Sequence, residues 1–267
     1  MISPLAQVDP KAKIANNVTI DAFSVVYGDV EVGEGTHIMP NVTIFNGSRI
    51  GKHCKIFPGA VIGAIPQDLK YNGEQTTAEI GDYTTIREYV TIHLGTKDKW
   101  KTKVGNNCLL MAYAHVAHDC IVGNNVILAN CVQLAGHVLV DDYAIIGGLT
   151  GAHQFTHVGA HAYVAGHVVI RKDVPPYVKA ARDPLTFAGI NKVGLSRRGF
   201  PKSTIDDITN IYHLLFVQAH STSKAIELIE SSLPDSTAKN EILEFVRGST
   251  IGIIRKAKEE IDENLAL

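Results

Sequence analysis

The sequence lacks the features that mark membrane, secreted and nucleic-acid-binding proteins. Its formal net charge is −2, so there is no basic excess to attract nucleic acid. It has no apolar run long enough to cross a bilayer and no charged-then-apolar leader at its start. The four cysteines include no CxxC pair, which disfavours a disulfide framework and a zinc ribbon. We therefore expect a cytoplasmic protein with no membrane span and no nucleic-acid partner.

What the sequence does contain is a repeat of six residues. Branched aliphatic residues occupy every sixth position from Val8 to Ile62, from Ile80 to Ile92 and from Val104 to Ile170, with Ala152 as the only exception. The position four residues after each aliphatic is usually small. Period six fits neither a helix nor a long alternating strand, and is typical of a chain that forms a short strand, turns a corner and repeats. Three such sides close a triangular coil of eighteen residues, with the aliphatic and small residues inside.

The repeat fails where charged residues fall in the aliphatic frame, at Asp68, Glu74 and Asp98. A charge cannot occupy a dry interior without a partner. We therefore expect residues 64–78 and 96–103 to form loops extruded from the prism. Loops held on a rigid scaffold commonly carry function.

After Ile170 the repeat ends in a Pro175-Pro176 pair, and from about residue 202 the apolar residues recur with a helical period. Ser203 is the expected N-cap of the first helix. Further helices are expected at 222–231, 236–247 and 249–264. The predicted fold is mainly β: a hexapeptide-repeat solenoid over residues 1–190 with the two extruded loops, followed by a small α-helical domain over 191–267.

Eight of the twelve histidines fall between residues 93 and 167. Stacking the chain in coils of eighteen places His118 beneath Gly136 and Gln154, and Asp119 beneath His137. One exposed corner of the prism should therefore gather a set of imidazole, carboxylate, amide and glycine groups: His115, His118, Asp119, Gly136, His137, His153 and Gln154.

These groups suit acyl transfer to a hydroxyl. One histidine can take the proton from the attacking hydroxyl, and a neighbouring carboxylate can fix the tautomer of that histidine. A glycine N–H one coil away can donate to the developing oxyanion. No serine or cysteine stands in a nucleophile setting, which favours direct transfer over a covalent acyl-enzyme. Converging histidines can also hold zinc, although no strict ligand spacing requires a metal.

The residues also resemble a known family. The six-residue repeat resembles the left-handed β-helix acyltransferases. Eight segments look like the UDP-N-acetylglucosamine O-acyltransferases, which catalyse the first step of lipid A biosynthesis. The segments are QDLKY at 67–71, IHLG at 92–95, AHVAHDC at 114–120, LAGH at 134–137, IGG at 146–148, HQF at 153–155, DVPPY at 173–177 and RRGF at 197–200. The resemblance covers essentially the whole chain.

The resemblance implies a reaction and its catalytic groups. The donor would be an (R)-3-hydroxyacyl chain on acyl carrier protein, and the acceptor the 3-hydroxyl of the glucosamine in UDP-N-acetylglucosamine. His118 would be the general base, Asp119 would orient it, and the Gly136 N–H would form the oxyanion hole. The family is a homotrimer with active sites in the clefts between prisms, and it uses no metal or other cofactor.

The resemblance also implies substrate contacts. Asn191, Arg197 and Arg198 would hold the UDP end, because a planar guanidinium matches phosphate oxygens. Gly166 corresponds to the position that limits acyl length, and Val193 stands where the family carries an acidic residue. The remaining substrate-binding residues would be Asp68, Leu69, Lys70, His115, His137, His153 and Gln154.

Three alternatives stay open at this point. The related solenoid N-acyltransferase acts later on the glucosamine 2-position, but it carries a separate N-terminal domain, whereas the repeat here begins at Val8. A zinc hydratase of the carbonic-anhydrase solenoid type would use the histidines as ligands. A non-catalytic partner-binding solenoid would need none of them.

Overall fold

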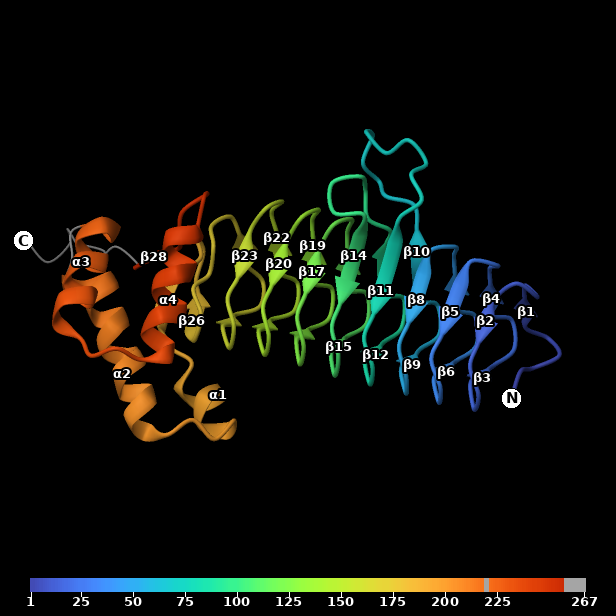
Figure 1. Cartoon of the computed structure of the whole chain (residues 1–267), viewed down its shortest axis with the longest axis horizontal. Coiled ribbons are helices and arrows are strands. Elements are labelled where there is room, and N and C mark those ends of the chain that lie inside the picture. Colours follow the sequence, from blue (N-terminus) through green and yellow to red (C-terminus); the bar gives the residue numbers. More distant parts are fainter. Residues whose placement is uncertain (219–220, 257–267) are drawn as a thin grey trace, which may run out of the picture.

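The chain is a left-handed parallel β-helix with helices at its C-terminal end (Figure 1). The computed structural model describes residues 1–218 and 221–256. Short parallel strands stack into three sheets that form the sides of a triangular prism. The predicted fold class is therefore confirmed.

Each sheet takes every third strand of the repeat. The first sheet contains β1 (Gln7–Val8), β4 (Val25–Val26), β7 (Thr43–Ile44), β10 (Val61–Ala64), β13 (Thr91–His93), β16 (His115–Val116), β19 (Gln133–Leu134), β22 (Gly151–Ala152) and β25 (Val169–Ile170). The second contains β2 (Lys13–Ile14), β5 (Val30–Val32), β8 (Ser48–Ile50), β11 (Thr77–Ile80), β14 (Lys101–Val104), β17 (Ile121–Val122), β20 (Leu139–Val140) and β23 (His157–Val158). The third contains β3 (Thr19–Ile20), β6 (His37–Ile38), β9 (Lys55–Ile56), β12 (Thr85–Ile86), β15 (Leu109–Leu110), β18 (Ile127–Leu128), β21 (Ile145–Ile146), β24 (Tyr163–Val164), β26 (Val178–Ala181), β27 (Thr186–Ile190) and β28 (Arg255–Lys256).

The prism has three kinds of corner, which we name by the sheets they join. The loop corner joins the first sheet to the second, the second corner joins the second sheet to the third, and the third corner joins the third sheet back to the first. The third residue of a corner has a positive φ, as at Asp119 (60°), His137 (64°) and Phe155 (65°) of the loop corner. This left-handed backbone conformation recurs along the prism and lets the chain turn after each short strand.

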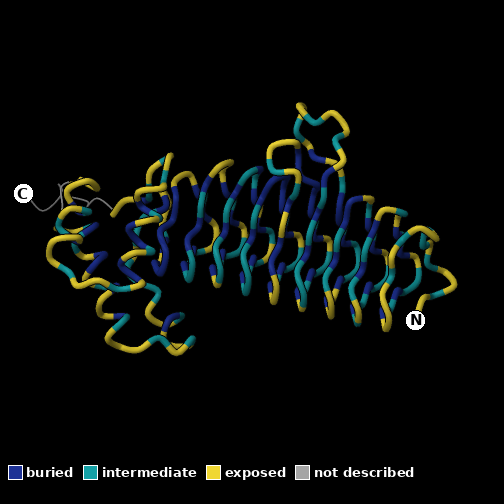
Figure 2. The backbone as a smooth tube through the Cα atoms, viewed as in Figure 1, coloured by how far each residue is buried: buried dark blue, intermediate teal, exposed yellow. Residues whose placement is uncertain are grey.

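The interior is filled as the six-residue repeat predicts. The aliphatic residue of each side and the small residue two positions before it are both buried, as with Ile62 and Ala60. Figure 2 shows buried residues recurring from coil to coil along the prism. Small hydroxyl residues at this position bond to the neighbouring coil. The Thr36 hydroxyl donates to the Gly51 carbonyl at 2.9 Å and accepts from the Cys54 N–H at 3.0 Å. The coil is thus held by close packing and by satisfied polar groups.

Two loops leave the prism, both at the loop corner (Figure 1). The first connects β10 to β11 through residues 65–76, and the second connects β13 to β14 through residues 94–100. Both are shorter than expected, because the flanking strands include residues 64, 77, 78 and 101–103. The loops preserve the register of the coils, since Ile62 still pairs with Ile92 and Ile80 with Val104.

The helices lie at the C-terminal end of the prism: α1 (Lys192–Arg197), α2 (Lys202–His213), the π-helical turn η1 (Leu214–Gln218), α3 (Thr222–Ser232) and α4 (Thr237–Gly248). The buried Tyr212 of α2 donates a hydrogen bond of 2.6 Å to the Pro176 carbonyl, which joins the helices to the end of the coil. None of the helices in the described residues is long and apolar enough to span a bilayer.

Two expectations about the helices are wrong. Ser203 lies inside α2, and the N-cap residue is Pro201, which has no side-chain acceptor to offer. The described part of the expected helix at 249–264, residues 249–256, is not helical. There β28 pairs with β27, and the Ile254 N–H bonds to the Asp173 carbonyl. Residues 257–264 of that expectation lie outside the described residues.

The packing of the coil generates a prediction of stability. Replacing Ile92, which is fully buried, by Ala should lower the free energy of unfolding by about 2–5 kcal/mol, because a close-packed interior cannot collapse around the cavity. Ile65 is exposed in the first loop, so Ile65→Ala is the matched control and should change stability by less than about 0.5 kcal/mol. Urea unfolding followed by circular dichroism measures both. Equal losses would contradict the packing described.

Candidate active site

The predicted catalytic residues meet at the loop corner. His118 and Asp119 follow β16, and Gly136 and His137 follow β19, one coil further along. The two strands pair in register, with His115 opposite Gln133 and Val116 opposite Leu134. Because the coil length is fixed, the stacking expected from the sequence holds here.

His118 and Asp119 form a hydrogen-bonded pair. Nδ1 of His118 lies 2.9 Å from Oδ2 of Asp119. The corner was expected to be exposed, but His118 is only 6% exposed and Asp119 is 0% exposed. The second loop covers Asp119, because its backbone and the Thr96 side chain bond to the Asp119 carboxylate.

The Asp119 carboxylate is surrounded by donors. Oδ1 accepts from the Thr96 N–H at 2.9 Å and the Lys99 N–H at 3.2 Å, and Oδ2 accepts from the Thr96 hydroxyl at 2.7 Å. Burial opposes ionisation, but the hydrogen bonds from Thr96, His118 and Lys99 outweigh it and lower the pKa of Asp119. An ionised carboxylate only accepts, so the proton of neutral His118 is on Nδ1 and Nε2 is free to accept another.

Gly136 lies against the other side of the His118 ring. A Cβ atom on Gly136 would stand 2.5 Å from both Cε1 and Nε2 of His118, so only glycine fits. Within the described residues, the Gly136 N–H has no hydrogen-bond acceptor. An unpaired backbone donor thus lies beside the free ring nitrogen.

The free N–H of Gly136 differs from the equivalent groups at the second corner. There, in four successive coils, a side-chain oxygen of the next coil accepts from the amide in the same repeat position. The bonds are Lys52 to Asp82 at 2.7 Å, Asp82 to Asn106 at 2.7 Å, Asn106 to Asn124 at 2.9 Å and Asn124 to Asp142 at 2.7 Å. The loop corner offers no such acceptor at Gly136.

His137 packs next to the pair. Its ring stacks on Phe155 with a centroid distance of 4.5 Å and meets the His118 ring edge-on at 5.0 Å. Its Nδ1 lies 3.1 Å from Oδ2 of Asp98, within ion-pair distance but without hydrogen-bond geometry. The second loop therefore lies against the His137 imidazole as well as the Asp119 carboxylate.

Two further histidines extend the cluster towards the N-terminal coils. The His115 Nδ1 lies 2.7 Å from the Thr91 hydroxyl, and its ring meets that of His93 at 4.7 Å. Burial, reinforced by His115 and His118, lowers the pKa of His93 to about 4, and burial also lowers the pKa of His115. Both therefore stay neutral at pH 7. His93 was not expected at the site, because its position in the six-residue repeat is that of any outward-facing residue.

Other predicted substrate residues lie at the loop corner without joining the cluster. His153 and Gln154 are exposed, and their side chains make no hydrogen bond or ion pair within the described part of the chain. The Asp68 side chain accepts from the Lys70 N–H at 2.9 Å and so stabilises its own turn. Leu69 and Lys70 are exposed at the tip of the first loop. These groups are open to a ligand but do not by themselves define one.

The predicted nucleotide residues lie at the second corner instead. Arg198 donates from Nη2 to the Tyr143 carbonyl at 3.0 Å, and its guanidinium lies over the Tyr143 ring. Asn191 caps α1 by accepting from the Gly194 N–H at 3.2 Å and donates to the His161 carbonyl at 2.9 Å. Arg197 is exposed. One chain thus does not bring these residues to His118.

Arg198 has an unused hydrogen-bond donor, and His161 has a ring nitrogen without a partner. Nη1 of Arg198 and Nδ1 of His161 are buried and have no hydrogen-bond partner among the described residues. Burial lowers the pKa of Arg198, and burial together with the Arg198 charge lowers the pKa of His161 to about 4. A guanidinium with a free donor is suited to an anionic ligand.

Gly166 lies at the third corner, between β24 and β25. A Cβ atom there would stand 2.8 Å from the Gly148 carbonyl oxygen, so the backbones of neighbouring coils approach closely. The predicted acyl-length position is therefore also separate from His118 within one chain.

The cluster is not suited to bind a cation, and the adjacent thiol is not suited to act as a covalent nucleophile. Atoms of His118, Asp119 and His137 lie within 4.8 Å of one another, as metal ligands do, but each Asp119 oxygen already accepts two hydrogen bonds. A metal would have to displace those donors. Cys120 is the adjacent thiol, and burial raises its pKa to about 12, so it stays protonated.

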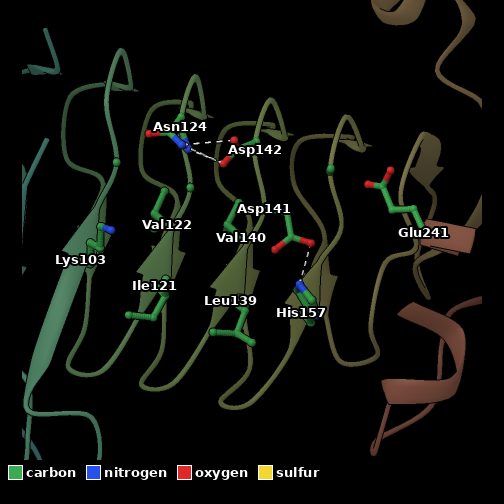
Figure 3. Close-up of a pocket in the computed structure, with 13 residues that line it drawn as sticks. Lys103, Ile121, Val122, Asn124, Leu139, Val140, Asp141, Asp142, His157 and Glu241 are labelled. Carbon is green, nitrogen blue, oxygen red and sulfur yellow. Dashed lines mark hydrogen bonds and ion pairs between the residues drawn. The ribbon is translucent and has the colours of Figure 1, made fainter. Parts of the chain in front are cut away.

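Two of the hollows in the described part of the chain lie outside the cluster. One, of about 610 Å³, runs along the second sheet towards α4, and Figure 3 shows His157 paired with Asp141 and Asn124 with Asp142 along it. The other, of about 1060 Å³, lies beneath the first loop against the stacked rings of Tyr27 and Phe45. Neither contains His118 or Gly136.

Two family profiles match parts of the chain. Residues 173–254 match the profile described as UDP-N-acetylglucosamine O-acyltransferase, domain 2, and residues 11–46 and 101–136 match the bacterial transferase hexapeptide of six repeats.

Solved structures match over nearly the whole chain. LpxA, a UDP-N-acetylglucosamine acyltransferase from Bacteroides fragilis, is 48% identical with a TM-score of 0.94, covering 96% of this chain and 100% of that one. The Francisella novicida UDP-N-acetylglucosamine acyltransferase is 39% identical with a TM-score of 0.94, covering 100% and 99%. The Arabidopsis enzyme is 30% identical with a TM-score of 0.84, covering 97% and 100%. Because identities of this size extend over both coil and helices, the chain belongs to the family of UDP-N-acetylglucosamine O-acyltransferases.

Proposed function

We propose that this enzyme transfers an (R)-3-hydroxyacyl chain from acyl carrier protein to the 3-hydroxyl of the glucosamine in UDP-N-acetylglucosamine. This would be the first step of lipid A biosynthesis, carried out in the cytoplasm. The observation that carries the proposal is the buried His118–Asp119 pair, whose free Nε2 lies beside the unpaired N–H of Gly136. Solved relatives named as UDP-N-acetylglucosamine acyltransferases support the acceptor.

The proposed mechanism is direct attack. Nε2 of His118 takes the proton from the sugar 3-hydroxyl as its oxygen attacks the thioester carbonyl carbon. The carbonyl oxygen becomes an oxyanion, which the Gly136 N–H stabilises. The C–S bond then breaks, and His118 returns the proton to the departing thiolate. Asp119 stabilises the imidazolium that forms between these steps.

The substrate would bind between chains. His118 lies at the loop corner and Arg198 at the second corner, so a site that uses both takes them from different subunits. A homotrimer with clefts between prisms satisfies this requirement. Asn191, Arg197 and Arg198 of one subunit would hold the diphosphate and nucleoside.

The acyl chain and sugar would occupy the rest of the cleft. His115, His137, His153 and Gln154 would face the sugar, and Asp68, Leu69 and Lys70 would reach it from the first loop. Gly166, at the third corner, would be the position that sets acyl length, and its missing side chain would leave room for a longer acyl chain.

The reaction itself gives the first test. Purified protein should acylate UDP-N-acetylglucosamine from hydroxyacyl carrier proteins, with one chain length preferred, and mild alkali should cleave the ester product. His118→Gln should lower kcat by about 10²- to 10⁴-fold, the range for loss of a general base. His53 is exposed and stacks on Tyr83 away from the site, so His53→Gln is the control and should keep wild-type turnover. Near-normal turnover in the His118 variant would remove His118 as the base, and an amide product would indicate N-acylation.

The nucleotide contacts give a separate test. Arg197→Ala should raise the KM for UDP-N-acetylglucosamine by about 10- to 100-fold, which corresponds to the loss of a charge-assisted hydrogen bond. Its effect on kcat should be small, because the residue is far from the reacting atoms. Lys11, an exposed cation near the other end of the prism, provides the control Lys11→Ala. An unchanged KM in the Arg197 variant would argue against its phosphate role.

A further inference from the structure

The second loop closes over the Asp119 carboxylate, and the residue that does so most directly is Thr96. We propose that Thr96 is a positioning residue for the reaction, whose N–H and hydroxyl hold the Asp119 carboxylate in line with Nδ1 of His118. The inference rests on the proposed function, because it assigns Thr96 a part in aiming the proposed base.

The hydrogen bonds fix how the carboxylate is turned. Thr96 bonds to both oxygens, with its N–H 2.9 Å from Oδ1 and its hydroxyl 2.7 Å from Oδ2. Oδ2 also accepts from Nδ1 of His118 at 2.9 Å. Rotation of the carboxylate would break the Thr96 bonds together with the His118 bond, so the hydroxyl sets the direction in which Oδ2 faces the ring.

The direction of the Thr96 hydroxyl is itself determined. Its oxygen accepts from the Asp98 N–H at 3.3 Å, and an ionised carboxylate cannot donate. The hydroxyl proton therefore points at Asp119. On the other side of the loop, the Asp98 carboxylate lies 3.1 Å from Nδ1 of His137.

The loop holds Thr96 in place from both ends. The Trp100 N–H donates to the Thr96 carbonyl at 2.8 Å, and the Gly95 N–H donates to the Thr77 carbonyl at 3.2 Å. The Thr76 hydroxyl donates to the Gly95 carbonyl at 2.7 Å. A residue fixed in this way can position a neighbour rather than follow its movement.

The cover over Asp119 is not a requirement of the coil. Asp119 occupies the third position of its corner. Other residues in that position are exposed: Phe155, two coils further along the same corner, is 59% exposed, and Tyr113, at the third corner, is 56% exposed. Asp119 is 0% exposed. Since water does not reach the carboxylate, nothing replaces the Thr96 hydroxyl when it is removed.

The test compares variants that differ in the hydroxyl. Thr96→Val keeps the shape and removes the donor, and Thr96→Ser keeps the donor. In the acyltransferase assay Thr96→Val should lower kcat by about 10- to 100-fold with KM for UDP-N-acetylglucosamine within about twofold, because the hydrogen bond acts on the base and not on binding. Thr96→Ser should restore most of kcat. Thr36→Val is the matched control, because it removes an equally buried hydroxyl distant from the site, and it should leave kcat unchanged.

A readout independent of turnover separates this proposal from the proposed function. In ¹⁵N spectra of histidine-labelled protein, His118, assigned by its loss in His118→Gln, should carry its proton on Nδ1 in the wild type. In Thr96→Val, or in Thr96→Ala should the first variant not fold, the ring should shift towards a mixture of tautomers. Wild-type kcat and an unshifted His118 signal in these variants would overturn the role of Thr96. An inactive wild type with a Thr96-dependent tautomer would overturn the proposed reaction and leave the positioning role standing.

Discussion

The narrow interior of the coil is the constraint on which the rest of the structure depends. Each side of the triangle admits one branched aliphatic and one small residue, and both must be buried in register with the coils above and below. The interior leaves no room for polar reactive groups, so those of the candidate site lie at the corners, in the loops or at strand positions such as His115. The same constraint makes the corners rigid, because neighbouring coils bond to each other through their backbones. The backbone of a histidine at such a corner is therefore held in place by the neighbouring coils.

The loops show how the constraint is kept while function is added. Both leave from the loop corner, and both return the chain so that inward aliphatics still meet, as Ile62 meets Ile92 and Ile80 meets Val104. The first loop stays open, with Leu69 and Lys70 exposed at its tip. The second folds back onto the prism and buries Asp119. The two loops at this corner thus have different roles. The first provides an accessible surface, and the second encloses an ionised carboxylate away from water.

Features set by the six-residue repeat could be predicted from the sequence, whereas the folding of the loops and of the C-terminal segment could not. His118 under Gly136 and Asp119 under His137 followed from the eighteen-residue coil, because its length is fixed by the interior. The burial of Asp119 did not, since it depends on how the second loop folds and on which of its N–H groups bond to Asp119. The separation of Arg198 from His118 depends on where the chain leaves the last coil. The expected helix at 249–264 failed because pairing of β28 with β27 overrides local helical pattern in the described part of that segment.

The corners of the coil differ in whether their backbone amides find hydrogen-bond acceptors. At the second corner, Asp and Asn side chains of the following coils accept the amides of Lys52, Asp82, Asn106 and Asn124, whereas the amide of Gly136 at the loop corner has no acceptor among the described residues. The solenoid therefore carries rows of equivalent backbone donors whose reactivity is set by what the following coil supplies. New binding or catalytic capacity in such a protein requires no new backbone. It requires only that a corner amide be left without an acceptor from the following coil and lie beside a suitable side chain.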